Sequence, residues 1–316
     1  MPVLAASPAL EELQLLEERP VEGIPAGNLS GLAWCDGALW AVSDREDDRL
    51  YRLNSQDGLW QAEAESFIAP PAPPIPLPWG VRMRSWLTAL VRGGGLDFEG
   101  LSCDAQGNRY LVSEARAAVL QLAPFGQPQW LALPPGMVRQ ARASGMLLHF
   151  NALLEGIAID PAGERLWLAG ERQRRGLLVL HKQASRWHCS GGCVLLSEGG
   201  SEPLPAPAEG GKPMPRDFSG LAFHREKLFT LERQAHRICR RQLSDGELER
   251  CWSFAAEALT EARHYDKPYG MAEALWIDEE GAWIGLDNGR NARGDGELRP
   301  IVWRFAAPKG GWGSTR

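Results

Sequence analysis

Acidic side chains recur at two matching places in five copies of one short phrase. The copies span 28–44, 97–114, 153–171, 217–232 and 271–287. Each has a small or acidic residue, usually a glycine, an apolar run, a turn, and a second apolar run that ends in a carboxylate. At the start of the first run, three copies carry a glutamate and two carry Ser30 and Ser219. A repeat architecture would bring these equivalent positions together.

The three glutamates at the start of the first run are candidate metal ligands. If they gather in space, their like charge requires protons or a cation to compensate it. An all-oxygen ligand set with several carboxylates suits a hard cation, Ca²⁺ in preference to Zn²⁺. We therefore predict a bound calcium ion whose ligands are Glu99, Glu155 and Glu273.

The carboxylates that end the second run are candidates for acid–base chemistry. They are Asp44, Glu114, Glu171, Glu232 and Asp287. Glu171 and Glu232 could act as a general base, and so could two loop histidines, His149 and His264. For each histidine a structural or solvated role is the alternative.

An arginine directly follows three of these carboxylates. Guanidinium groups bind phosphate or carboxylate through paired hydrogen bonds, which makes them candidate receptors for an anionic substrate. The alternative is that each arginine pairs with the carboxylate beside it. The three arginines are Arg45, Arg172 and Arg233.

The elements that would position these groups are short strands. Apolar runs rich in Val, Ile, Leu and Trp alternate with turns such as Asp36-Gly37, and they lack a helical period. In the first copy we expect strands at 32–34, 38–43, 49–54 and 61–68. Four strands per unit predict an all-β fold, a β-propeller of five four-stranded blades, with six blades as the alternative. The fifth unit has three strands, so an N-terminal strand at about 11–20 is expected to close the ring.

Antiparallel pairing predicts that both ends of the phrase lie at one mouth of the central channel. The connections between units reach that same face, and they are long: 70–96, 134–153, 199–217 and 255–271. Long excursions on one face of a repeat fold usually mark the binding side. The whole chain, 1–316, is thus expected to form one propeller domain with its ligand at the mouth.

Composition narrows the class of partner. A net charge of −6 argues against nucleic acid, which requires a basic surface. No apolar stretch approaches the ~18 residues of a transmembrane helix. The Ala-rich start resembles the tail of a secretory signal, so a trimmed chain would be periplasmic or secreted and a native start cytoplasmic. Cys239 and Cys251 could face each other across a hairpin, and Cys189 and Cys193 bracket a short loop, but free thiols remain the alternative.

Together the five copies resemble a known family. The motifs SGLAW, FEGLS, LLEGIAID, FSGLAF and AEALWID, in this order over residues 28–305, are similar to those of phytase-like propellers described by an esterase-like activity of phytase. They also resemble the related SdiA-regulated propellers. The resemblance implies a calcium ion near the channel mouth, at the three glutamates that match the motif. It also implies hydrolysis of a phosphate or carboxyl ester.

Two hypotheses follow from these patterns. The first is a calcium-dependent hydrolase of an anionic ester, in which the arginines hold the anion and a histidine or a second carboxylate takes the proton. The second is a noncatalytic propeller that binds a small ligand or a protein partner and keeps the cation for structure. Fold alone does not separate the two.

Overall fold

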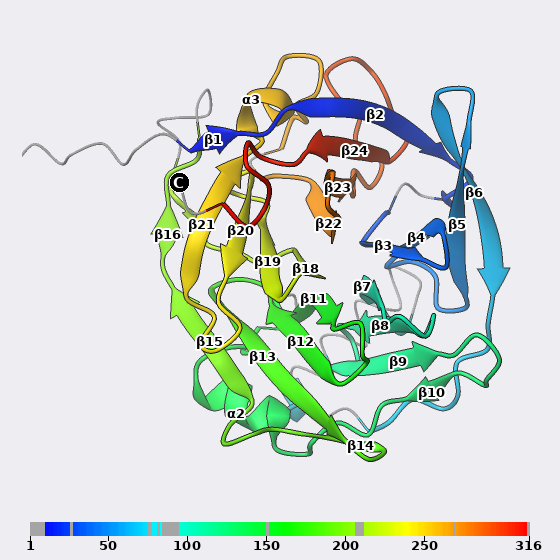
Figure 1. Ribbon diagram of the computed structural model, residues 1–316, viewed down its shortest axis with the longest axis vertical. Coiled ribbons are helices and arrows are strands. Elements are labelled where there is room, and N and C mark those ends of the chain that lie inside the picture. The colour runs from blue at the N-terminus through cyan, green and yellow to red at the C-terminus, as the bar shows by residue number, and fades with distance from the viewer. Residues whose placement is uncertain are drawn as a thin grey trace, which may run out of the picture.

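The strands of this computed structural model form repeated antiparallel sheets around a common centre (Figure 1). The structure describes residues 10–25, 28–74, 77–80, 83, 95–149, 152–205, 212–267 and 269–314. The first nine residues, where the signal-like start falls, and most of the 70–96 insertion lie outside these ranges.

Each phrase supplies the two innermost strands of a unit. The first unit pairs β3 (Gly31–Cys35), β4 (Ala38–Val42), β5 (Arg49–Gln56) and β6 (Leu59–Ser66). The second pairs β7 (Phe98–Cys103), β8 (Arg109–Ser113), β9 (Ala118–Leu122) and β10 (Gln129–Trp130). The third pairs β11 (Leu154–Ile159), β12 (Arg165–Gly170) and β13 (Arg174–Gln183), with β14 (Arg186–His188) and β15 (Val194–Gly199) both on β13.

The remaining units follow the same order. One pairs β18 (Gly220–His224), β19 (Lys227–Glu232), β20 (Arg237–Arg241) and β21 (Leu248–Ser253), and β1 (Glu11–Glu12) adds to its edge. The last pairs β22 (Ala272–Ile277), β23 (Gly281–Leu286) and β24 (Ile301–Ala306). A small ribbon of β16 (Ser201–Glu202) and β17 (Met214–Pro215) and two helices, α2 (Met137–Ala143) and α3 (Ala255–Ala258), lie in the connections. None of the helices in the described ranges has the length and apolar character to span a bilayer.

The first strands of the units touch one another in a closed circuit. β3 contacts β7, β7 contacts β11, β11 contacts β18, β18 contacts β22, and β22 returns to β3. This circuit, with the other strands radiating outward from it, defines a β-propeller (Figure 1).

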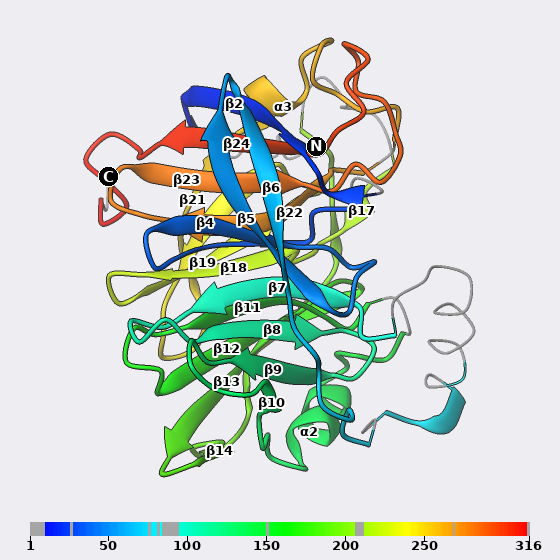
Figure 2. The same ribbon diagram turned by 90° about the vertical axis from the view of Figure 1, so that its right-hand side faces the viewer.

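The N-terminal segment joins the last unit to the first. β2 (Leu15–Glu22) pairs antiparallel with β24, where Glu18 lies opposite Trp303, and parallel with β6, where Val21 lies opposite Trp60. The result is an eight-stranded sheet in the order β22-β23-β24-β2-β6-β5-β4-β3. Figure 2 shows β2 crossing beside β24 and β6. Because β2 covers the edges of both units, neither edge is left open to another chain.

The glycine in the phrase is required by the close approach of neighbouring inner strands. A Cβ atom on Gly31 would lie 2.7 Å from the backbone nitrogen of Leu101, and one on Gly220 would lie 2.9 Å from the carbonyl oxygen of Glu273. Such contacts are shorter than side-chain carbons tolerate, so the tight inner circuit depends on the missing side chain. The fifth copy has Ala274 at this place, and its side chain is buried against the first unit.

All six cysteines form disulfide bonds. Cys239–Cys251 joins directly opposite positions of β20 and β21, and Cys189–Cys193 closes a short loop. Cys35–Cys103, which the sequence spacing did not suggest, links the ends of β3 and β7 and so ties the first unit to the second.

The disulfide between the two units is expected to contribute more stability than the short-loop one. Cys35–Cys103 spans a sequence separation of 68, whereas Cys189–Cys193 spans 4, and a longer closed loop constrains the unfolded chain more. Replacing Cys35 and Cys103 together by serine should lower the free energy of unfolding by about 2–4 kcal/mol. Urea unfolding checks this, with the Cys189/Cys193 double serine variant as control. Equal losses in the two variants would contradict the expectation.

Candidate functional site

Three carboxylates come together at the mouth of the central channel. Oxygen atoms of Asp44, Asp97 and Glu99 all lie within 4.8 Å of one another. Asp44 follows β4, Asp97 directly precedes β7, and Glu99 is the second residue of β7. Asp44 is buried and the other two are half-buried, so the group offers a partly enclosed set of oxygen ligands.

A β-bulge marks each glutamate at the start of the first run. The pairing register shifts between Phe98 and Gly100, between Leu154 and Gly156, and between Ala272 and Ala274. The residue skipped in each case is the glutamate: Glu99, Glu155 and Glu273. A β-bulge changes the direction in which a side chain points. Here the bulges break the alternation of side chains along each strand, and the three glutamates line the channel.

The two serine copies have a regular register and a different role. The Ser30 hydroxyl donates to the carbonyl of Phe98, and the Ser219 hydroxyl donates to the carbonyl of Ala272, each at 2.7 Å. Both bonds cross from one unit to the next. The serines therefore fasten adjacent inner strands, and the glutamate copies supply the charge.

The axis of the channel is almost closed below this mouth. A cavity of about 10 Å³ lies among the phrase glycines, and Glu99, Glu155 and Glu273 all line it. That volume is about the minimum for one water molecule. The predicted triad thus shares the channel, but Glu155 and Glu273 are not members of the close group that Glu99 forms with the two aspartates.

Burial and mutual repulsion raise the pKa of the carboxyl groups around the mouth. Burial, with the charges of Glu155 and Asp97, raises the pKa of Glu99 well above its usual value. Burial and the charge of Glu171 raise the pKa of Glu155 to about 8. Burial and the charge of Asp44 raise the pKa of Asp287 to about 6. These raised pKa values reflect burial and the mutual repulsion of the carboxyl groups.

One buried guanidinium, that of Arg233, offsets the negative charge of three other carboxylates near the mouth. Arg233 is 7% exposed and forms ion pairs with Glu171, Glu273 and, at 3.1 Å from Nε to Oδ2, Asp217. The donors of Arg233 already face three carboxylates, and the binding of a substrate anion by this arginine stays a prediction. Glu273 is paired with this arginine, and its role as a metal ligand stays a prediction.

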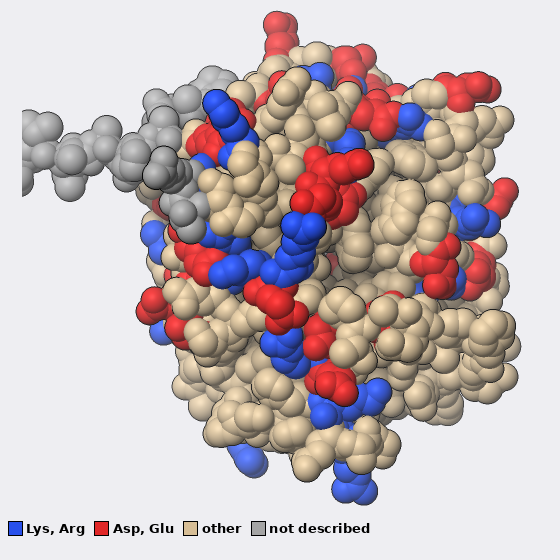
Figure 3. Space-filling view, in the orientation of Figure 1, with Lys and Arg blue, Asp and Glu red and all other residues tan. Residues whose placement is uncertain are grey.

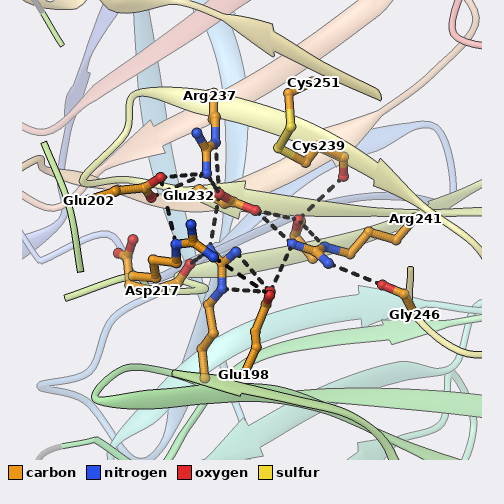
Figure 4. The surroundings of a disulfide bond; sticks show 12 residues. Glu198, Glu202, Asp217, Glu232, Arg237, Cys239, Arg241, Gly246 and Cys251 are labelled. Atoms are coloured by element: carbon orange, nitrogen blue, oxygen red, sulfur yellow. Dashed lines mark hydrogen bonds and ion pairs between the residues drawn. A yellow bond between two sulfur atoms is a disulfide. The ribbon is translucent and has the colours of Figure 1, made fainter. Parts of the chain in front are cut away.

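Glu232 lies in a separate cluster of arginines between the third and fourth units (Figure 4). Its carboxylate, fully buried, accepts from Arg237 Nε at 2.8 Å and Arg241 Nη2 at 2.9 Å, and Arg175 Nη1 lies 3.0 Å away. Although burial acts to raise the pKa of Glu232, the three guanidinium groups outweigh it and lower the pKa to about 2. A carboxylate with that pKa is a weak base, so the catalytic role expected for Glu232 is not supported.

The remaining candidates are close to the surface. Arg45 Nε lies 3.4 Å from Asp44, and Arg172 pairs with Glu171, so both arginines border the carboxylates and are about one-third exposed. Glu171 itself is 1% exposed and held by Arg172 and Arg233. His149 and His264 are exposed, and His264 Nδ1 lies 2.9 Å from the carbonyl of Glu261.

Two aspartates of the site were missed by the sequence reasoning. Asp97 belongs to the closest carboxylate group, and Asp217 is an ion-pair partner of Arg233. Burial raises the pKa of Asp217 to about 6. Both belong to the same dipeptide, Asp-Phe, two residues before Glu99 and Ser219. This repeated Asp-Phe was the available signal, and its phenylalanines, Phe98 and Phe218, are fully buried beside the mouth.

The face of the molecule seen in Figure 1 has a different charge pattern. Basic and acidic side chains are interspersed over it (Figure 3). Ion pairs between Arg165 and Glu226 and between Arg225 and Glu279 join the hairpins of neighbouring units. Such exposed pairs contribute little to binding or stability.

The fold and site together define a β-propeller with an acidic channel mouth. A model of the phytase-like family, described as "Esterase-like activity of phytase", matches residues 24–186, which is just over half of the chain. The chain belongs to this phytase-like family. A comparison with curated protein sequences gives no match.

Several solved structures are similar at low identity. Glutaminyl cyclase from Myxococcus xanthus is 10% identical with a TM-score of 0.49, covering 93% of this chain and 97% of that one. The PQQ-bound aldose sugar dehydrogenase from Streptomyces coelicolor is 11% identical with a TM-score of 0.47, covering 94% and 98%. A chain of a nidogen/laminin complex is 14% identical with a TM-score of 0.45, covering 83% and 73%.

Proposed function

We propose that this protein is a five-bladed propeller that binds Ca²⁺ at its channel mouth through Asp44, Asp97 and Glu99. The donor set supports this assignment, because three carboxylates with oxygens within 4.8 Å match the all-oxygen coordination that Ca²⁺ prefers. The raised pKa of Glu99 also supports it, because burial and the neighbouring carboxylates disfavour the charged form, and a bound cation would offset that cost.

The proposed activity is hydrolysis of an anionic phosphate or carboxyl ester at this mouth. A bound Ca²⁺ would supply polarisation of an ester oxygen and a lower pKa for a bound water. Arg45 and Arg172 border the carboxylates and would hold the anionic part of the substrate. Proton transfer would fall to His149, an exposed loop histidine, rather than to His264, which lines the separate cavity described below.

A noncatalytic ligand- or partner-binding propeller is the second candidate function. One observation favours it: Glu171 and Glu232, the two carboxylates expected to act as a base, are both held by arginines. In this case the cation would stabilise the mouth and the loop-rich face would carry the binding.

Calcium binding is tested by the thermal stability of the protein. Ca²⁺ at a hundredfold excess over its Kd should stabilise the fold by about 2.7 kcal/mol, which raises the Tm. The Tm of Glu99→Gln should not respond to Ca²⁺. Without Ca²⁺, this variant should be at least as stable as wild type, because it removes one repelling charge. Glu63→Gln, on exposed β6, removes the same charge elsewhere and should respond as wild type does. An equal response of Glu99→Gln and wild type would rule out this ligand set.

Turnover is tested separately on the same proteins. Hydrolysis of p-nitrophenyl phosphate and p-nitrophenyl acetate should require Ca²⁺, stop with a chelator, and be lost in Glu99→Gln. If Ca²⁺ raises the Tm and neither ester is hydrolysed under any condition, the hydrolase proposal fails and the binding function stands.

A further inference from the structure

A second site lies apart from the carboxylates, between the fourth and fifth units. It is a cavity of about 150 Å³ whose inner wall is formed by buried apolar side chains. These include Phe254, Met271, Leu286 and Trp303, each less than one-tenth exposed. A cavity of this size with apolar walls can hold one benzene-sized body.

The aromatic side chains of the wall are fixed in position. Phe254 and Trp303 meet edge to face with ring centroids 6.3 Å apart, and His236 meets Phe254 at 5.8 Å in the same manner. The indole nitrogen of Trp303 donates to Glu18 at 2.8 Å, which fixes its rotation. A planar ring that binds against Phe254 and Trp303 could make further edge-to-face contacts with them.

Apart from two tyrosines, the ionisable side chains that line the cavity are all basic. They are His236, Arg263, His264 and Lys267, and no aspartate or glutamate lines it among the described residues. Arg263 is paired with Glu18 and Glu257. No ion pair of Lys267 occurs within the described ranges, and this lysine is exposed at the opening. Burial lowers the pKa of His236 to about 4, so this histidine is neutral near pH 7. Lys267 is therefore the lining charge that could attract an anion to this apolar cavity.

We infer that this cavity binds a small aromatic carboxylate, with its ring against Phe254 and Trp303 and its carboxylate toward Lys267. The site is distinct from the proposed cation site, although Met271 lies two residues before Glu273 in the chain. Binding is therefore expected with a chelator present.

The test uses phenylacetate as the probe and isothermal titration calorimetry in a chelator. Wild type should bind with a Kd in the millimolar range or tighter, and phenethylamine, a cation with a similar body, should not bind. Ala258→Phe places a ring in the cavity, where Ala258 is 6% exposed, and should abolish binding. Lys267→Glu should weaken binding about fivefold or more.

Matched controls separate binding from folding. Lys182→Glu makes the same charge change at an exposed site outside the cavity and should leave the Kd unchanged. Because Lys267 is exposed, its variant should fold even if Ala258→Phe does not. The inference is overturned if wild type does not bind phenylacetate, if phenethylamine binds equally well, or if Lys267→Glu binds like Lys182→Glu.

Discussion

Replacing Arg233 by methionine is expected to lower the free energy of unfolding by about 3–5 kcal/mol. The guanidinium is buried against Glu171, Asp217 and Glu273. Methionine keeps most of its volume but removes a counter-charge from each of the three carboxylates, of which, among the described residues, Glu171 alone keeps a second ion pair, with Arg172. The charges of Glu155 and Glu99 also act on Arg233 and help to raise its pKa. Removing the guanidinium therefore also removes an attraction to these two glutamates. Urea unfolding at pH 7 measures the effect.

A control variant and the response to Ca²⁺ complete this experiment. Arg225→Met removes an arginine whose side chain is 72% exposed and pairs with Glu279, so it should cost less than about 1 kcal/mol. If Ca²⁺ binds the mouth, the Arg233→Met variant should gain more stability from Ca²⁺ than wild type does, because its mouth is more negative. A loss no larger than that of Arg225→Met would show that Arg233 is not the main counter-ion of the site.

Replacing Glu232 by glutamine should also cost about 3–5 kcal/mol near neutral pH. This carboxylate is the common partner of Arg175, Arg237 and Arg241, and without it three buried or half-buried guanidinium groups face one another. Glu198 and Glu202 pair with some of the same arginines and limit the loss. Chemical unfolding compares the variant with wild type, and Glu226→Gln, at an exposed ion pair, is the control.

The Glu232 effect should depend on pH in a defined direction. The folded-state pKa, about 2, is below the usual 4.5. The stabilisation is therefore fully present above pH 4.5 and is lost as the pH falls toward 2. The difference between wild type and Glu232→Gln should shrink over that window. A difference that stays constant from pH 6 to pH 2.5 would show that the carboxylate's charge is not what stabilises this cluster.

Much of the architecture was predictable because it follows local patterning. The strands expected at 32–34, 38–43, 49–54 and 61–68 correspond to β3, β4, β5 and β6 within a few residues, since each is an apolar run bounded by turns. Helix α2 in the 134–153 connection was not anticipated, because its seven residues are too short to show a period. The Asp97-Phe98 and Asp217-Phe218 dipeptides likewise resemble ordinary strand starts, so the sequence did not mark their aspartates as part of the candidate site.

The site was predictable in its location but not in its pairings. Glu99, Glu155 and Glu273 do meet at the channel, as equivalent positions of a repeat should. Which carboxylate each arginine meets depends on contacts between distant segments, and the Arg233–Asp217 pair is an example. The 68-residue separation of Cys35 and Cys103 hid their bond for the same reason, since neighbouring inner strands come together only when the ring closes.

The close packing of the inner strands closes the central channel along the propeller axis. The phrase glycines leave a space of about 10 Å³ between the inner strands, which is about the size of one water molecule. A larger molecule or a hydrated ion therefore does not fit through the ring. Whatever enters the acidic mouth must leave by the same opening. If the proposed hydrolysis takes place, substrate and product therefore use the same opening, and a slowly released product would block the next substrate molecule from entering.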